Sequence, residues 1–192
     1  MLSALEPDSK HSSVMLASLG GLSDDARERL DQGVNVRTYL DRLLNEALSA
    51  DGVTIIARML PRKYAIAWAC DCFEAAAAGQ ELDPIERSGL SAAKRWLADP
   101  TEEHRRAAMD LAERLGYATP GAWLAAAAGW AEGSLAPPDV TAVPPPDTLA
   151  GEAVSAALKL LAAADREHFT ERLEQYARRA LDTFAPAPGE RR

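Results

Sequence analysis

Hydrophobic residues recur along this chain with the spacing of helices that are buried on one side. The clearest stripe lies between residues 36 and 48, and a second runs through residues 169–184. Apolar positions at i, i+3, i+4 and i+7 share one face of an α-helix. No stretch shows the strict alternation of a half-buried strand, so the pattern predicts an all-α fold. The first stripe consists of Val36, Tyr39, Leu40, Leu43, Leu44, Ala47 and Leu48.

Capping residues and prolines indicate where the helices begin. A Ser, Thr or Asp just before an apolar run is typical of an N-cap, and proline suits the first helical turn, as at Pro84 and Pro120. Glycine after such a run indicates a stop. The predicted caps are Ser23, Asp83, either Thr101 or Asp99, Thr119 and Thr148. The predicted helix ends lie at Gly33, Asp51–Gly52, Gly79 and Gly116. A break in the last helical region is predicted near Asp165.

These signals together predict an irregular single-domain bundle of about six to eight helices, spanning residues 23–184. Residues 1–22 are predicted to be a flexible N-terminal segment, and residues 185–192 a disordered tail. Residues 134–147 hold five prolines and cannot be helical, so they form a stiff Pro-rich strap before the last long helix.

Composition supports helices and excludes some partners. Alanine accounts for 39 of the 192 residues, and aromatic residues make up only 6%. The net charge is -8 and no basic cluster is present, which argues against a nucleic-acid partner. The pairs Arg105–Arg106 and Arg178–Arg179 are interpreted as solvated helix faces. The longest apolar run, Ala122–Ala131, is about half the length that crosses a bilayer, so no membrane insertion is expected.

Cysteine and histidine give little support to catalysis. Cys70 and Cys72 would diverge on a helix, so we interpret them as core thiols rather than zinc ligands. Reduced thiols suit a cytoplasmic location. Asp165 and His168 have i, i+3 spacing, but a dimetal site needs further inward carboxylates. The sequence therefore predicts no catalytic residue, no metal and no cofactor.

One segment could bind a partner protein. Gly121, Ala125, Gly129 and Gly133 form a small-residue stripe, which suits either a tightly packed central helix or a surface for a partner helix. The Pro-rich strap is likewise either a connection or a ligand. The candidate partner-binding residues are Trp123, Trp130, Leu135, Pro137, Pro138, Pro144, Pro145 and Pro146.

Three segments resemble an uncharacterised bacterial family of short, Ala-rich helical proteins, a domain of unknown function. They are LPRKxAxxWAC at residues 60–70, AAxxWxxDPTEExRRAA at residues 92–108 and GSLAPP at residues 133–138. The resemblance covers residues 53–163. Some members are encoded near type VI secretion genes, which implies an accessory, adaptor or immunity role. It implies no reaction and carries over no catalytic residue.

We therefore expect a non-enzymatic helical protein that binds another protein, as an accessory, adaptor or chaperone-like component of a bacterial secretion system. The first alternative is an immunity protein that neutralises a toxin, because an acidic surface would complement a basic one. An enzyme with an unrecognised site is the second alternative.

Overall fold

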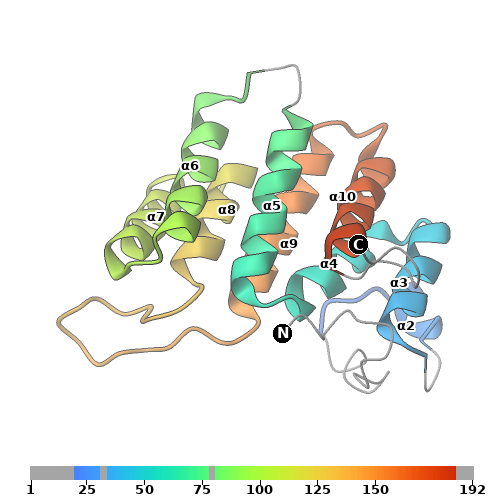
Figure 1. The fold of residues 1–192 in the computed structure, drawn as a ribbon, viewed down its shortest axis with the longest axis horizontal. Helices are drawn as coiled ribbons and strands as arrows, with labels where there is room; N and C mark the ends of the chain where they lie inside the picture. The colour runs from blue at the N-terminus through green and yellow to red at the C-terminus, as the bar shows by residue number, and fades with distance from the viewer. Residues whose placement is uncertain (1–19, 31–33, 78–80, 185–192) are drawn as a thin grey trace. The chain divides into compact units, whose positions relative to one another are not determined.

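A computed structural model describes residues 20–30, 34–77 and 81–184 (Figure 1). The chain divides into two compact units, the first made of residues 1–60 and 162–192 and the second of residues 61–161. The described residues form nine α-helices and no strand. The all-α prediction is therefore confirmed, with slightly more helices than the six to eight expected.

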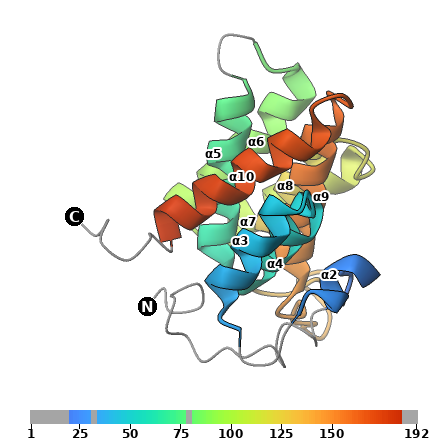
Figure 2. The same cartoon turned by 90° about the vertical axis from the view of Figure 1, so that its right-hand side faces the viewer.

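The first unit contains α2 (Asp24–Glu28), α3 (Val36–Asn45), α4 (Ser49–Met59) and α10 (Phe169–Phe184). Within it, α4 packs against both α10 and α3 (Figure 2). The two predicted stripes supply much of its core, because an apolar face removed from water is the main driving force of folding. From these stripes the buried residues are Val36, Tyr39, Leu40, Leu43, Leu44, Leu173, Tyr176 and Ala180.

The predicted stop at Asp51–Gly52 is wrong, because both residues lie inside α4. The chain instead breaks after α3 at Ala47, whose φ of 61° is left-handed. Asp51 sits in the first turn of α4, where a negative charge is favourable. Its carboxylate accepts hydrogen bonds from the backbone N–H and the hydroxyl of Ser23, at 2.8 and 2.9 Å. Tertiary contacts thus keep a turn-favouring dipeptide helical.

The second unit contains α5 (Arg62–Ala76), α6 (Pro84–Ala98), α7 (Glu102–Arg114), α8 (Pro120–Gly129) and all but the last two residues of α9 (Leu149–Ala163). Three predicted N-caps are confirmed here. The side chains of Asp83, Thr101 and Thr119 each accept a hydrogen bond from a backbone N–H of the following turn. The predicted break near Asp165 is also confirmed, since it lies between α9 and α10.

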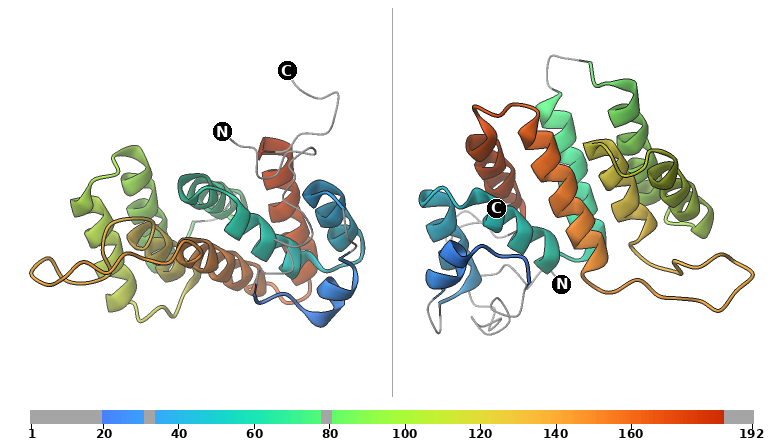
Figure 3. Two further views of the ribbon diagram at one scale, coloured as in Figure 1. Left: turned by 90° about the horizontal axis from the view of Figure 1, so that it is seen from below. Right: turned by 180° about the vertical axis from the view of Figure 1, so that it is seen from behind.

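Helix α8 is the central helix of the second unit and packs against α6, α7 and α5 (Figure 3). Its small residues let neighbouring backbones come close. A Cβ atom on Gly121 would lie 2.8 Å from the Cα of Glu86 in α6, and one on Gly129 would lie 2.8 Å from the Cα of Met109 in α7. Helices of this chain therefore cover the small-residue side of α8, as the central-helix interpretation requires.

Some sequence predictions concern residues beyond those that the structure describes. The helix ends at Gly33 and Gly79 and the disordered tail at residues 185–192 lie outside the described residues. Of the predicted flexible segment, residues 1–19 also lie outside them. Leu22, the last residue of that segment, is buried.

Candidate functional site

Residues 134–147, here called the loop, connect α8 to α9 without any helix and extend beyond the ends of both (Figures 1 and 3). Loops of this length without secondary structure are uncommon in compact domains, and they are usually either functional or linker segments. The prediction that this segment is not helical is confirmed.

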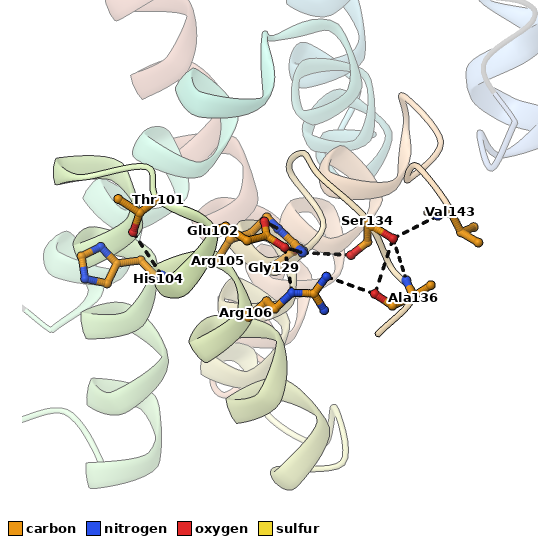
Figure 4. Close-up of polar contacts among 9 residues, drawn as sticks. All are labelled: Thr101, Glu102, His104, Arg105, Arg106, Gly129, Ser134, Ala136 and Val143. Atoms are coloured by element: carbon orange, nitrogen blue, oxygen red, sulfur yellow. Dashed lines mark hydrogen bonds and ion pairs between the residues drawn. The ribbon is translucent and has the colours of Figure 1, made fainter. Parts of the chain in front are cut away.

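Arg105 of α7 anchors the start of the loop (Figure 4). Its side chain is only 1% exposed. The guanidinium donates to the carbonyl oxygens of Gly129 and Ser134, at 2.5 and 2.9 Å. It also binds both carboxylate oxygens of Glu102, at 2.6 and 2.7 Å. A buried charge is tolerated when it is paired and its donors are satisfied, and Arg105 meets both conditions.

Glu102 and Arg106 extend this anchor to the next residues of the loop. The Arg106 guanidinium donates to Glu102 at 2.7 Å and to the carbonyl oxygen of Ala136 at 3.1 Å. Hydrogen bonds from Arg105 lower the pKa of the Glu102 carboxyl, although burial opposes this shift. The carboxylate therefore stays charged to a lower pH than a free glutamate, and it pairs with both arginines.

The loop is also tied to itself and to α5. The Ser134 hydroxyl accepts hydrogen bonds from the N–H groups of Ala136 and Val143, both at 3.0 Å. The Leu135 N–H donates to the Val143 carbonyl at 2.8 Å, which closes the loop on itself. At the far end, Arg62 of α5 contacts the exposed carboxylate of Asp147. Side chains of α7 and α5 thus contact the two ends of the loop.

Between its anchors the loop exposes apolar side chains. Val140 is 57% exposed and Val143 is 50% exposed, more than any other large apolar residue described. Four of the five prolines are also exposed, namely Pro137, Pro138, Pro144 and Pro146. Exposed apolar side chains that gather in one segment make it a candidate binding surface.

The other predicted partner-binding residues differ in their surroundings. Pro145 is buried and Leu135 is half-buried, so both are less accessible to a partner than the four exposed prolines. Trp123 and Trp130 are half-buried and contact each other, with ring centroids 6.1 Å apart. Both also lie 5.6 Å from the ring of Tyr117. Rings at these separations touch directly, which leaves no room for a ligand among them.

The backbone conformation of Tyr117 indicates that the cluster of Tyr117, Trp123 and Trp130 has a structural role. Its φ is 53°, in the left-handed region that costs about 1–2 kcal/mol for a residue with a Cβ. Each aromatic pair contributes about 0.5–1.5 kcal/mol beyond its buried area, so the contacts with Trp123 and Trp130 offset the strain. The cluster therefore fixes the turn between α7 and α8.

Sequence reasoning missed Arg105, and the interpretation of Arg105–Arg106 as a solvated face is wrong for this residue. The missed signal is its place on the buried stripe of α7, at positions i, i+3, i+4 and i+7 with Ala108, Met109 and Ala112. Arg178 and Arg179, by contrast, are exposed as expected.

Cys70 and Cys72 are free and buried, as the core-thiol interpretation requires. Burial raises the pKa of the Cys70 thiol to about 12, while the nearby Lys94 opposes the shift. Among the described residues no group of three or more His, Cys, Asp or Glu is placed to hold a metal ion. Asp165 and His168 do approach each other, at 3.0 Å on an exposed surface.

We expect Cys70 to resist alkylation in the folded protein. A thiol with a pKa of about 12 holds almost no thiolate at pH 8. Iodoacetamide should therefore modify it at least about a hundredfold more slowly than in the denatured chain. The reaction should accelerate as pH rises towards 12. Intact-mass analysis of a Cys72→Ser variant measures the rate, and equal rates for folded and denatured protein would refute the core-thiol assignment.

Comparison with known proteins gives a family but no activity. A model described as a family of unknown function (DUF6931) matches residues 39–184. The chain belongs to that family. The resemblance to an uncharacterised domain is thereby confirmed, and the match spans Arg105 and the whole loop. No curated protein and no solved structure shows a significant similarity to the chain. Within the described residues, no helix is long and apolar enough to cross a membrane.

Proposed function

We propose that this chain is a non-enzymatic protein that binds another protein through the loop, residues 134–147. The observation that carries the proposal is the combination of a fixed base and an exposed apolar tip. Arg105 is buried and donates to the carbonyl oxygen of Ser134, the first residue of the loop, while Val140 and Val143 are at least half exposed.

The anchoring favours recognition over a simple connection. A flexible segment loses conformational entropy when a partner binds it, and a segment already fixed in shape avoids much of that cost. Prolines in the loop reduce the cost further, because their φ is set before binding. A partner that covers Val140 and Val143 would gain the free energy of removing their side chains from water.

The form of this function that the family resemblance supports is an accessory, adaptor or chaperone-like role in a bacterial secretion system, in the cytoplasm. The free thiols of Cys70 and Cys72 fit that location. The net charge of -8 supports the alternative of an immunity protein, since a basic toxin would be attracted to it. The identity of the captured partner separates the two roles.

The proposal predicts that a Val140→Ser, Val143→Ser double variant loses its partner without losing stability. Both positions are exposed, so the unfolding free energy should change by no more than about 0.5 kcal/mol per site. Capture of a partner from a lysate of the native host should fall about tenfold or more, because the variant loses the about 1.5–3 kcal/mol gained by burying each valine side chain.

The matched control is Ile85→Ser, which removes an apolar side chain of comparable exposure, 42%, from α6 of the same unit. The control should capture the partner as the wild-type protein does. Equal capture by the wild type, the control and the double variant would contradict binding through the loop.

A further inference from the structure

A groove of about 300 Å³ runs between α6 and α7 in the second unit. Its apolar side, here called the floor, is made largely of small side chains. The floor residues are Ala92, Ala107, Ala108 and Leu111. A groove of this size is at the small end of the pockets that hold small molecules.

The charge of the groove is opposite to that of the chain as a whole. The chain carries 29 acidic against 21 basic residues. The ionisable residues lining the groove, among those the structure describes, are Arg95, His104 and Arg114, and no acidic residue lines it. Two positive side chains that line a common groove repel each other. An anion bound between them would be attracted to both, which offsets that repulsion.

Within the second unit, ion pairing distinguishes these two arginines from the others. The guanidinium groups of Arg62, Arg87, Arg105 and Arg106 each form an ion pair with a carboxylate. Within the described part of the chain, the guanidinium groups of Arg95 and Arg114 form neither an ion pair nor a hydrogen bond. Their donors are therefore available to a ligand.

His104 and a serine add to the polar rim. The Nδ1 atom of His104 lies 2.8 Å from the carbonyl oxygen of Asp99, which can only accept, so Nδ1 carries the proton. This hydrogen bond fixes the orientation of the imidazole ring, and Nε2 takes no part in it. Ser91 lines the groove from α6 and supplies a hydroxyl group.

We infer that this groove binds a small organic phosphate, with its phosphoryl group between Arg95 and Arg114. A planar guanidinium group can donate hydrogen bonds to two phosphate oxygens at once. The two negative charges of a phosphate monoester balance the charges of two arginines, whereas a carboxylate balances only one. The alanine-lined floor would hold the organic part of the ligand. The inference is independent of the loop and holds whichever protein the loop binds.

The test uses the full chain, with phenyl phosphate, inorganic phosphate and benzoate as probes. Isothermal titration at constant ionic strength measures each Kd, with sodium chloride replacing the probe salt. Phenyl phosphate should bind saturably and more tightly than inorganic phosphate, because its ring meets the apolar floor. Arg95→Gln and Arg114→Gln should each weaken it about tenfold or more, since each removes a charge-assisted contact.

The control variant is Arg87→Gln, which changes an arginine of α6 that pairs with Glu81 and does not line the groove. It should leave the affinity for phenyl phosphate unchanged. Absence of saturable phenyl phosphate binding below about 10 mM would overturn the inference. So would an unchanged Kd in both arginine variants, or benzoate binding as tight as that of phenyl phosphate. Circular dichroism confirms that each variant is folded.

Discussion

Replacement of Arg105 by methionine should lower the unfolding free energy by about 2–4 kcal/mol, since a buried polar group left without its partner costs about 1–3 kcal/mol and two carbonyl oxygens lose a donor. The variant fills a similar volume but donates no hydrogen bond. It leaves the carbonyl oxygens of Gly129 and Ser134 without the Arg105 donor, and Glu102 without its bidentate partner. Urea unfolding followed by circular dichroism measures the loss.

Arg178→Met is the matched control, because Arg178 forms an exposed i, i+4 pair with Glu174 in α10. Exposed pairs of this kind contribute about 0.3–0.5 kcal/mol, so the control should be nearly neutral. Hydrogen exchange gives a second measurement. In the Arg105 variant the amides of Leu135 and Val143 should lose protection, since their bonds depend on an anchored loop. A loss no larger than that of the control would contradict the role of Arg105 as the anchor.

The stability that the contact between Glu102 and Arg105 contributes should also depend on pH. Hydrogen bonds from Arg105 lower the pKa of Glu102 in the folded state, so the folded protein releases this proton more readily than the unfolded chain. The resulting stability is present above the unfolded pKa of about 4.3 and is lost as pH falls through the lower folded value. A Glu102→Gln variant should therefore differ from the wild type at pH 7 and converge with it at acidic pH.

Replacement of Gly89 by alanine should destabilise the second unit by about 3 kcal/mol, the upper part of the range for overpacking. A Cβ atom at this position would lie 2.6 Å from the Cα of Gly121 and closer still to its carbonyl group. These are backbone atoms, so α6 and α8 must move apart. The gain of about 1 kcal/mol in helix propensity from glycine to alanine offsets only part of this cost.

Gly52→Ala provides the contrast. Its Cβ would lie 3.1 Å from Cδ2 of Leu44, the end of a side chain that can move by a few tenths of an ångström. The helix propensity gained in α4 should then balance the repacking, and the unfolding free energy should stay within about 1 kcal/mol of the wild type. If the two glycine variants were equally stable, the close approach of α6 and α8 would be refuted.

The features that the sequence predicts well are local ones. Asp83 with Pro84, and Thr119 with Pro120, begin α6 and α8 because a cap and a proline act within one turn. The break at Ala47 has no such signature, since alanine favours helices and its left-handed φ is imposed by the surrounding fold.

The candidate site was predictable only in part. Proline content excluded a helix from residues 134–147, but the exposure of Pro144 and the burial of Pro145 depend on tertiary packing. Arg105 escaped prediction because its backbone partners lie 24 and 29 residues further along the chain. A charged residue on an apolar stripe, three positions after an acid, is the local sign of such an anchor.

The most direct test of recognition through the loop is site-specific photo-crosslinking in the native host. A photoreactive amino acid at Val140 is compared with the same group at Ile85, whose exposure is similar. We expect one protein to be cross-linked from position 140 and not from position 85, and the adduct to weaken in the Arg105→Met background. The same adducts from both positions, or none from position 140, would contradict the proposal that the loop binds a partner protein.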